Sequence, residues 1–436
     1  MKSKFFKRVA GVILMMSFVF APINFSFAQV SIQDEQEKLQ ALMLQVKVLL
    51  VEVVRLQTML LEYQSGVLPE EVSSEEIDNI VSRSVIWFKN AQEEDGHFRY
   101  EYVPYENKYL NDDNIVRQAG AMYVLGEVLR RDTNNVHDLK ENVERAALYF
   151  EKLSLRDEYE GRQLQCVVSK EGSRTCVLGT TSLVLIGLID LVKRYPALSS
   201  VYADRISDYA AYILATKKEG AGFRNYHYVG REEQNDKESS FSTGEALLAL
   251  VRYYEFHPTD EVKQVIDDTF EYMQNDMPFD FGLYLWAMAA LKEMQQIVPN
   301  DEYVSYVKDY TDWRMVNFER YRGSTHNMCA YAEGVISAYS VLEPSSTNEE
   351  KEKYLEDINY WLGQSAKLQI TKKDTDRLVY NNDTAYFATF ADPDRAIGGF
   401  LTDKNELTQR IDFTQHCLSS FIQKKVDIDG GVIAAP

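Results

Sequence analysis

Residues 242–251 read STGEALLALV, a run of small and apolar residues that carries one glutamate, Glu245, near its start. Such a run is typical of a helix that is packed on every side, because close contact between helices requires small side chains and few charges. Five other segments share this texture: QAGAMYVLGEVL at 118–129, GTTSLVLIGLIDL at 179–191, DFGLYLWAMAAL at 280–291, HNMCAYAEGVISAY at 326–339 and RIDFTQHCLSSFI at 410–422.

Each of the six small-residue segments follows a helical segment with a more polar surface, so the chain repeats a two-helix unit. The pattern predicts an all-α fold of twelve helices in six pairs, with the small-residue helices as an inner ring and the others outside. The expected helices are 74–92, 113–131, 137–155, 178–194, 199–217, 242–257, 259–275, 280–296, 300–321, 326–342, 346–369 and 410–425.

The connections between these helices differ in length. Those that enter the inner helices are long (93–112, 156–177, 218–241 and 370–409), whereas those that leave them are short. The long loops should therefore gather at the N-terminal ends of the inner helices, where unpaired amides and positive helix dipoles also point. The sequence thus predicts a cleft at that end of the ring.

Six helical hairpins in one ring resemble the (α/α)6 toroids, and AQEEDGHFRY, STGEALLALVRYYE and RIDFTQHCLSSFI are similar to segments of the six-hairpin glycosidases and their relatives. These relatives include unsaturated glucuronyl hydrolases, N-acylglucosamine 2-epimerases, the helical domain of glucuronyl C5-epimerases and several polysaccharide lyases. The resemblance covers about residues 74–425 and implies a carbohydrate cleft with aromatic walls and Asp or Glu as acid and base. Terpene cyclases and prenyltransferases share the ring, so the fold alone does not fix the function.

The sequence departs from several members of this group. It lacks the zinc constellation of prenyltransferases, the DxDD motif of protonating cyclases and a strong match to the histidine motifs of the 2-epimerases. We therefore expect no metal and no cofactor, and the reaction within carbohydrate chemistry stays open.

The first 28 residues have the features of a secretory signal peptide. Four basic residues precede the uncharged run VAGVILMMSFVFA, and small residues, Ser26 and Ala28, stand where a signal peptidase would cleave. The run is shorter than the roughly 20 residues that span a bilayer. We expect an exported protein that is secreted, periplasmic or at the cell surface; an uncleaved anchor is the alternative.

Residues 29–65 are predicted to form an association helix, followed by a linker at 66–73 and the toroid domain at 74–436. Apolar residues recur at spacings of three and four between residues 32 and 63, as in a coiled coil, which predicts a homo-oligomer and allows association with the cell envelope. The helix is apolar almost all round, so packing against the globular domain or formation of a higher oligomer is the alternative.

The formal net charge of the 436 residues is -20, and loss of the four basic and no acidic groups of residues 1–28 would make it -24. Such a chain repels phosphate backbones, so nucleic acid is not expected as a partner. Neutral or short glycans suit this charge better than polyuronates, although a local basic cleft could override the global field.

The four cysteines allow three pairings in an exported chain. Cys166 and Cys176 bracket a polar loop whose turn residues could bring them together, which predicts a disulfide. Cys329 and Cys417 lie inside apolar helical patterns, and we expect them to be buried free thiols.

The candidate catalytic residues lie near the predicted cleft and comprise Asp113, Glu245, Asp280, Glu333, Asp412 and His416. Glu245 has the S-x-x-E spacing of a capping box with Ser242, which is the structural alternative to a role in chemistry. Glu333 lies about two turns into its helix and cannot be a cap; an ion pair with an outer helix is its alternative. Asp412 and His416 are four apart and could orient one another, or be a cap beside an unrelated histidine.

Further residues are expected to bind substrate: Asp112, Arg117, Tyr226, His227, Tyr284, Trp286, His326 and Asn327. Arg117 would hold a substrate carboxylate or hydroxyl, or else pair with one of the two aspartates before its helix. The aromatic residues would stack on sugar faces, or else belong to the core.

Two classes of function follow. The first is an enzyme that hydrolyses or epimerises a short glycan through paired carboxylates, with a polysaccharide lyase as a weaker variant. The second is a non-catalytic module that binds glycan or cell envelope and is displayed by the coiled coil. Convergence of two acidic groups and an arginine at one end of the ring would favour the enzyme.

Self-association is expected to depend on the N-terminal helix. Deletion of residues 29–68 should convert the oligomer to a monomer, because the heptad seam is removed. Sedimentation equilibrium of the mature chain and of the deletion variant measures this; an unchanged mass would contradict the prediction.

Overall fold

The computed structural model describes residues 71–104, 106–320, 327–372, 376–381, 384–390, 392–403 and 406–434, with five residues between 38 and 46. The chain forms two compact units, Met1–Gln64 and Ser65–Pro436. In the first, the five described residues are helical and exposed. The predicted signal peptide and nearly all of the predicted association helix lie outside the described residues.

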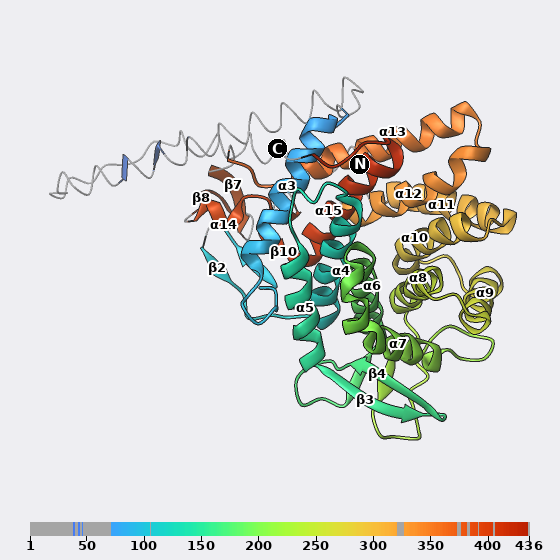
Figure 1. Ribbon diagram of the computed structural model, residues 1–436. Helices are drawn as coiled ribbons and strands as arrows, with labels where there is room; N and C mark the ends of the chain where they lie inside the picture. The colour runs from blue at the N-terminus through green and yellow to red at the C-terminus, as the bar shows by residue number, and fades with distance from the viewer. Residues whose placement is uncertain are drawn as a thin grey trace. The chain divides into compact units, whose positions relative to one another are not determined.

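Twelve long helices make up the described part of the second unit, and they alternate between two layers (Figure 1). The outer helices are α3 (Ser74–Ala91), α5 (Lys140–Lys152), α7 (Ser199–Thr216), α9 (Asp260–Asn275), α11 (Asp301–Arg320) and α13 (Asn348–Ala366). The inner helices are α4 (Ile115–Arg131), α6 (Leu178–Arg194), α8 (Ser240–Phe256), α10 (Phe281–Ile297), α12 (Met328–Leu342) and α15 (Ile411–Gln423). Short helical turns complete the set: η1 (Pro196–Leu198), η2 (Glu343–Ser345), α14 (Pro393–Ala396) and the π-helical η3 (Lys424–Ile428).

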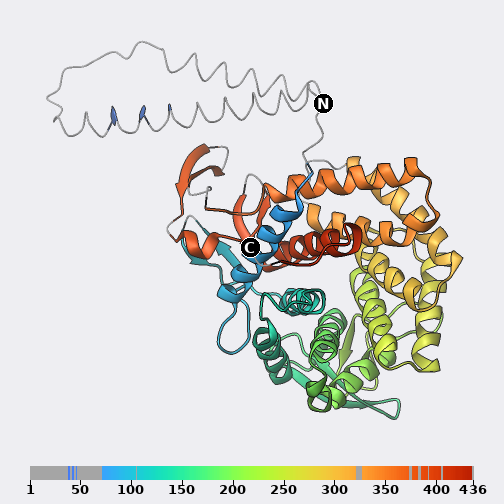
Figure 2. The same ribbon diagram turned by 45° about the horizontal axis from the view of Figure 1, so that its top comes forward.

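The inner helices form a closed ring. Each packs against the next, and α15 returns to pack against α4, so the last inner helix lies beside the first (Figure 2). The predicted (α/α)6 toroid of six hairpins is confirmed.

Burial explains which helices lie inside. In α6, every residue from Leu178 to Val192 is buried, which the small and apolar composition of this segment permits. The outer helix α9 instead buries one stripe, with Val262, Ile266 and Met273 facing the ring and charged residues facing solvent. This is the amphipathic pattern of a helix with one covered face.

The long loops contain short antiparallel strands, which the all-α expectation did not include. A four-stranded sheet has the order β2 (Lys108–Tyr109), β1 (Glu101–Val103), β10 (Glu406–Arg410) and β9 (Leu401–Asp403). Three pairs complete the set: β3 (Ser154–Tyr159) with β4 (Arg162–Val167), β5 (Thr175–Val177) with β6 (Tyr226–Tyr228), and β7 (Asp376–Asn381) with β8 (Thr384–Thr389).

The four-stranded sheet joins the loop that enters the first inner helix to the loop that enters the last. Glu101 of β1 stands opposite Arg410 of β10, and the Ile411 amide donates to the Tyr100 carbonyl over 3.1 Å. This bond satisfies one of the free amides at the start of α15, which has no side-chain cap. The sheet therefore holds α15 beside α4 at the N-terminal end of the ring.

Both cysteine pairs are disulfides. The predicted bond between Cys166 and Cys176 is confirmed, with a Cα–Cα distance of 5.7 Å. The expectation of free thiols at Cys329 and Cys417 is wrong, because the two residues face each other from α12 and α15 with Cα atoms 4.7 Å apart. Their separation of 88 residues hid a contact that neighbouring inner helices create. Among the described helices, none is long and apolar enough to cross a bilayer.

The bond between α12 and α15 should stabilise the fold more than the loop disulfide does. A disulfide stabilises the fold by lowering the entropy of the unfolded chain, and this effect grows with the length of the loop that it closes. The bond that spans 88 residues should therefore stabilise the fold by about 2 kcal/mol more than the bond that spans 10. The double variant C329A/C417A is therefore expected to lose more unfolding free energy in urea than C166A/C176A. Equal losses would contradict this expectation.

Candidate active site

A pocket of about 410 Å³ opens at the N-terminal ends of the inner helices, as the loop lengths predicted. All six inner helices, or the residues that precede them, contribute to its wall. The polar and charged lining residues are Asn114, Arg117, Asn225, Tyr226, Ser239, Ser242, Glu245, Arg314, Asp412, Gln415 and His416.

Glu245 lies in the wall of this pocket and is not a cap. Helix α8 begins at Ser240, and the side chain of Ser239 accepts from the Ser242 amide, so the helix starts three residues earlier than the predicted capping box requires. The Ser242 hydroxyl donates instead to Asn225 Oδ1 over 2.6 Å. The capping-box alternative is therefore wrong.

The carboxyl group of Glu245 is buried and has no hydrogen-bond partner among the described residues. A Cβ atom at Gly179 of α6 would lie 2.1 Å from Glu245 Oε2, so only glycine leaves room for the carboxyl group at that position. Burial raises the pKa of Glu245 to about 7, although the charge of His416 opposes the shift. The group can therefore hold a proton near neutral pH.

His416 lines the same pocket and is held by Glu333. The imidazole Nδ1 lies 2.8 Å from Glu333 Oε2, and Glu333 is fully buried on α12. Nδ1 donates in this pair, which leaves Nε2 as the acceptor; no described residue offers it a hydrogen bond. The adjacent Cys417 forms the disulfide to Cys329 on the helix that carries Glu333, so a covalent bond fixes the two helices at this level.

Asp412 is engaged by two arginines and does not orient His416. Its carboxylate accepts from Arg410 over 2.7 Å and forms an ion pair with Arg117 Nε at 3.0 Å. Arg117 also donates to the Tyr100 hydroxyl. The expected Asp412–His416 pair is thus wrong, because the ring brings Glu333 from the neighbouring helix to His416. The alternative for Arg117, an ion pair with one of the two aspartates before its helix, is also wrong, because Arg117 pairs with Asp412.

Ser419 connects Glu333 to a second buried carboxylate, Glu127 of α4. The serine oxygen lies 2.7 Å from Glu333 Oε1 and 2.5 Å from Glu127 Oε2. One hydroxyl proton cannot serve both oxygens, so one carboxyl group must carry a proton of its own.

Of these two carboxyl groups, Glu333 holds a proton more readily than Glu127 does. Burial raises the pKa of Glu333, with His416 opposing the shift. Burial also acts on Glu127, but Arg131 and then Arg130 outweigh it and hold the pKa of Glu127 below its ordinary value.

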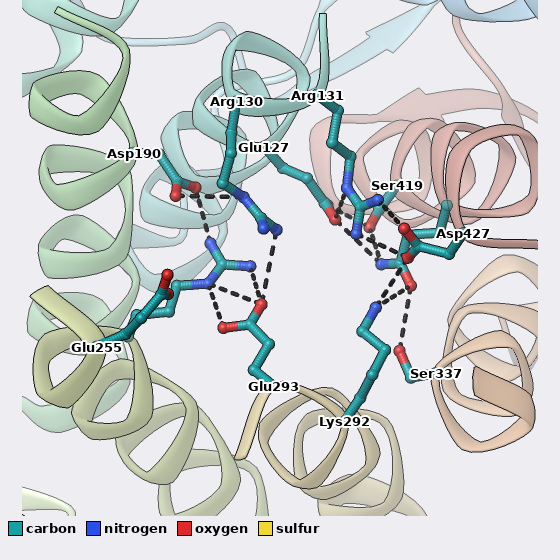
Figure 3. Close-up of polar contacts among 12 residues, drawn as sticks. Glu127, Arg130, Arg131, Asp190, Glu255, Lys292, Glu293, Ser337, Ser419 and Asp427 are labelled. Carbon is teal, nitrogen blue, oxygen red and sulfur yellow. Dashed lines mark hydrogen bonds and ion pairs between the residues drawn. The ribbon is translucent and has the colours of Figure 1, made fainter. Parts of the chain in front are cut away.

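Glu127 belongs to a cluster of buried charges at the C-terminal end of the ring, which Figure 3 shows. Arg252 of α8 donates to Asp190 of α6 over 2.7 Å and to Glu293 of α10 over 2.9 Å. The cluster contains four acidic and four basic side chains: Glu127, Asp190, Glu293 and Asp427, with Arg130, Arg131, Arg252 and Lys292. Its charges balance, as burial requires.

Several predicted site residues serve the fold instead of the pocket. Asp280 caps α10 by accepting from the Gly282 amide over 2.7 Å, and Asn327 caps α12. Asp113 accepts from Gln118 Nε2 over 2.8 Å and, like its exposed neighbour Asp112, lies outside the pocket wall.

Of the predicted aromatic and histidine residues, some line the pocket and others do not. Tyr226 and Trp286 line the pocket, and the Trp286 ring centroid lies 6.1 Å from that of His416. Tyr284 also borders it, but its hydroxyl bonds Thr311 on α11. His227 is buried against Asp157 at 2.7 Å, away from the pocket. His326 lies outside the described residues.

The sequence did not indicate Ser419 or Arg314 as site residues. Ser419 is one of several small residues in an inner helix, and only its closeness to Glu127 distinguishes it. Arg314 belongs to the outer helix α11, where an arginine usually faces solvent. No cluster of three or more His, Cys, Asp or Glu that could hold a metal is present in the described part of the chain.

Comparison with known proteins identifies similar folds but does not assign the chain to a family. No protein-family model matches the chain, and no curated protein matches its sequence. Among solved structures, an unsaturated glucuronyl hydrolase specific for heparin is similar, with 9% identity and a TM-score of 0.57 over 83% of this chain and 100% of the other.

Two further structures have the same fold. A cellobiose 2-epimerase from Bacillus thermoamylovorans has 11% identity and a TM-score of 0.55, over 80% of this chain and 99% of the other. A family 76 glycoside hydrolase from a bovine Bacteroides thetaiotaomicron strain has 9% identity and a TM-score of 0.55, over 81% and 78%. The chain therefore shares the (α/α)6 toroid fold with these structures.

The raised pKa of Glu245 predicts a pH-dependent difference in stability between the wild type and E245Q. Between the ordinary carboxyl pKa and about 7, the folded wild type binds a proton that the unfolded chain has lost, so its stability falls as pH rises. Relative to the wild type, E245Q should gain unfolding free energy between pH 5 and pH 8, by up to about 3 kcal/mol.

Urea denaturation at both pH values measures this difference. The matched control is E271Q, because Glu271 is an exposed glutamate on α9 and its replacement should leave the pH dependence unchanged. A difference between E245Q and the wild type that does not vary with pH would contradict the assignment.

Proposed function

We propose that the protein is a carbohydrate-active enzyme that hydrolyses a short glycan, with Glu245 as general acid and His416 as general base. The observation that carries this proposal is the free Nε2 of His416 in the same pocket as a carboxyl group whose pKa is about 7. A carboxyl group that can donate a proton and an imidazole nitrogen that can accept one, both in one pocket, suit glycoside hydrolysis.

The rest of the pocket supports this assignment. Two acidic groups and an arginine, Glu245, Asp412 and Arg117, converge at one end of the ring, which is the arrangement that favours an enzyme over a binding module. Trp286 and Tyr226 offer aromatic surface for a sugar face. The similar solved structures include glycoside hydrolases and sugar epimerases, which agrees with carbohydrate as the ligand.

In the proposed reaction, the protonated Glu245 gives its proton to the glycosidic oxygen as the bond from that oxygen to the anomeric carbon breaks. His416 Nε2 takes a proton from a water molecule, whose oxygen forms the new bond to the same carbon. Glu333 fixes the imidazole with Nδ1 protonated, which leaves Nε2 able to accept. Exchange with solvent then returns a proton to Glu245 and removes one from His416.

Epimerisation is the second candidate, because the base is a histidine and Asp412 is already bound by two arginines. In that reaction His416 would take a proton from a sugar carbon, and Glu245 would supply one. The two reactions differ in their products: hydrolysis adds the mass of one water, whereas epimerisation leaves the mass unchanged in H2O and introduces deuterium in D2O.

We also propose that the protein acts outside the cytoplasm. The signal-like residues 1–28 motivate this location, and the two disulfides support it, because such bonds persist in oxidising compartments. Self-association through residues 32–63 and contact with the cell envelope belong to the same proposal.

The purified mature chain should convert at least one short glycan in a panel that is followed by mass spectrometry. H416N and E245Q are each expected to lower kcat by at least about a hundredfold, the contribution typical of general acid or base catalysis. For the wild type, kcat should fall as pH rises past about 7, because Glu245 loses the proton that it must donate.

The control variants are H257N and E271Q, which alter exposed residues and should retain wild-type rates. Binding without conversion of any glycan would favour the non-catalytic module. Full activity in H416N and E245Q would reject the assigned roles.

A further inference from the structure

Arg314 reaches the pocket from the outer layer. It lies near the C-terminal end of α11, and outer helices run opposite to inner ones, so this end meets the N-terminal ends of the inner helices. Arg314 forms part of the pocket wall, yet only 6% of its surface is exposed. The site thus contains a buried guanidinium group next to open space.

Aromatic rings surround this guanidinium group. Its central carbon lies 4.4 Å from the ring centre of Phe281, 4.8 Å from that of Phe318 and 5.0 Å from that of Tyr331. These contacts stabilise a cation through the ring faces, each by about 0.5–2 kcal/mol. Burial of a full charge costs several kcal/mol, so the rings offset it only in part.

No carboxylate in the described part of the chain pairs with Arg314, and its Nε and Nη1 lack hydrogen-bond partners. The other buried basic residues among those described all have carboxylate partners: Arg131, Arg252, Lys292, Lys424 and Lys425. Arg314 is therefore an exception that faces a pocket.

We propose that Arg314 binds an anionic group of the substrate, so that the preferred ligand is a sugar with one carboxylate, of the uronic acid type. The carbohydrate part of this inference rests on the proposed function, whereas the anionic part rests on Arg314 alone. An arginine that is always charged and lacks a counter-ion gains most from a ligand that supplies one.

The rest of the pocket indicates a single negative charge. Asp412 and Arg117 neutralise each other in the wall, which leaves the single positive charge of Arg314, and Glu245 adds a negative charge above its pKa of about 7. This balance suits a monoanion better than a phosphate dianion. The net charge of -20 likewise disfavours a long polyanion. A short glycan with one acidic sugar satisfies both constraints.

The test compares ligands that differ only in charge. Isothermal titration calorimetry of the purified mature chain would use methyl β-glucuronide, its methyl ester and methyl β-glucoside. The wild type should bind the acid at least about thirtyfold more tightly than the ester, since an unpaired buried charge is costly. R314Q should bind the acid and the ester equally, while R156Q, which alters an exposed arginine, should keep the preference.

Further measurements keep the result decisive. If R314Q is unfolded at the assay temperature, two other measurements still test the inference. R314K retains a cation and should keep a preference for the acid over the ester, and the wild type can be compared with both ligands directly. Glucose 6-sulfate in place of the uronide distinguishes a sulfate ester from a carboxylate; tighter binding of the sulfate would overturn the carboxylate assignment. Equal binding of acid and ester by the wild type would overturn the whole inference.

The two proposals can fail separately. Turnover of neutral glycans without preference for acidic ones would reject the role of Arg314 and leave the enzyme intact. The wild type could instead bind the uronide, lose that binding in R314Q and convert no glycan. That result would support the role of Arg314 and reject the proposal that the protein is an enzyme.

Discussion

The ion pairs of Arg252 constrain the arrangement of the whole ring. This one guanidinium group binds Asp190 of α6 and Glu293 of α10 from its position on α8, so it ties three consecutive inner helices together. Removal of one partner from such a buried pair leaves an uncompensated charge that costs about 3–5 kcal/mol. The rotation of each helix about its own axis is thereby restricted, and the residues nearer the N-terminal ends face the pocket as a result.

The site depends on this restriction in two ways. Glu245 lies on the same helix as Arg252, close to two turns nearer the N-terminus, so the face that presents the ion pairs also presents the carboxyl group. Glu127, part of the same charged cluster, connects through Ser419 to Glu333 and then to His416. Hydrogen bonds therefore connect the charged end of the ring to His416 at the pocket end.

The helices and the position of the cleft could be predicted from the sequence because both depend on local composition and loop length. The small-residue segments identified the inner helices, and their observed bounds differ from the expected ones by a few residues. The partners of the site residues could not be predicted, because they come from different helices. His416 was matched with Asp412 on its own helix, whereas the ring places Glu333 of α12 next to it.

The same limit applies to the cysteines and to the strands. Cys329 and Cys417 each look like buried apolar residues within their own helices, and only the adjacency of α12 and α15 makes them a pair. The strands of the four-stranded sheet are two to five residues long, and β1 and β10 pair across about three hundred residues of sequence. Segments this short carry little periodic signal, so their pairing depends on tertiary structure.

The pairing of the first inner helix with the last has a consequence for the order of folding. The ion pair between Arg117 of α4 and Asp412 of α15, like the β1–β10 pairing, joins residues that are synthesised far apart in time. Contacts of such long sequence separation form late, because the entropy of closing the intervening chain must be overcome first. His416 lies on the same final helix, so a nascent or C-terminally truncated chain has an open ring and cannot assemble the pocket.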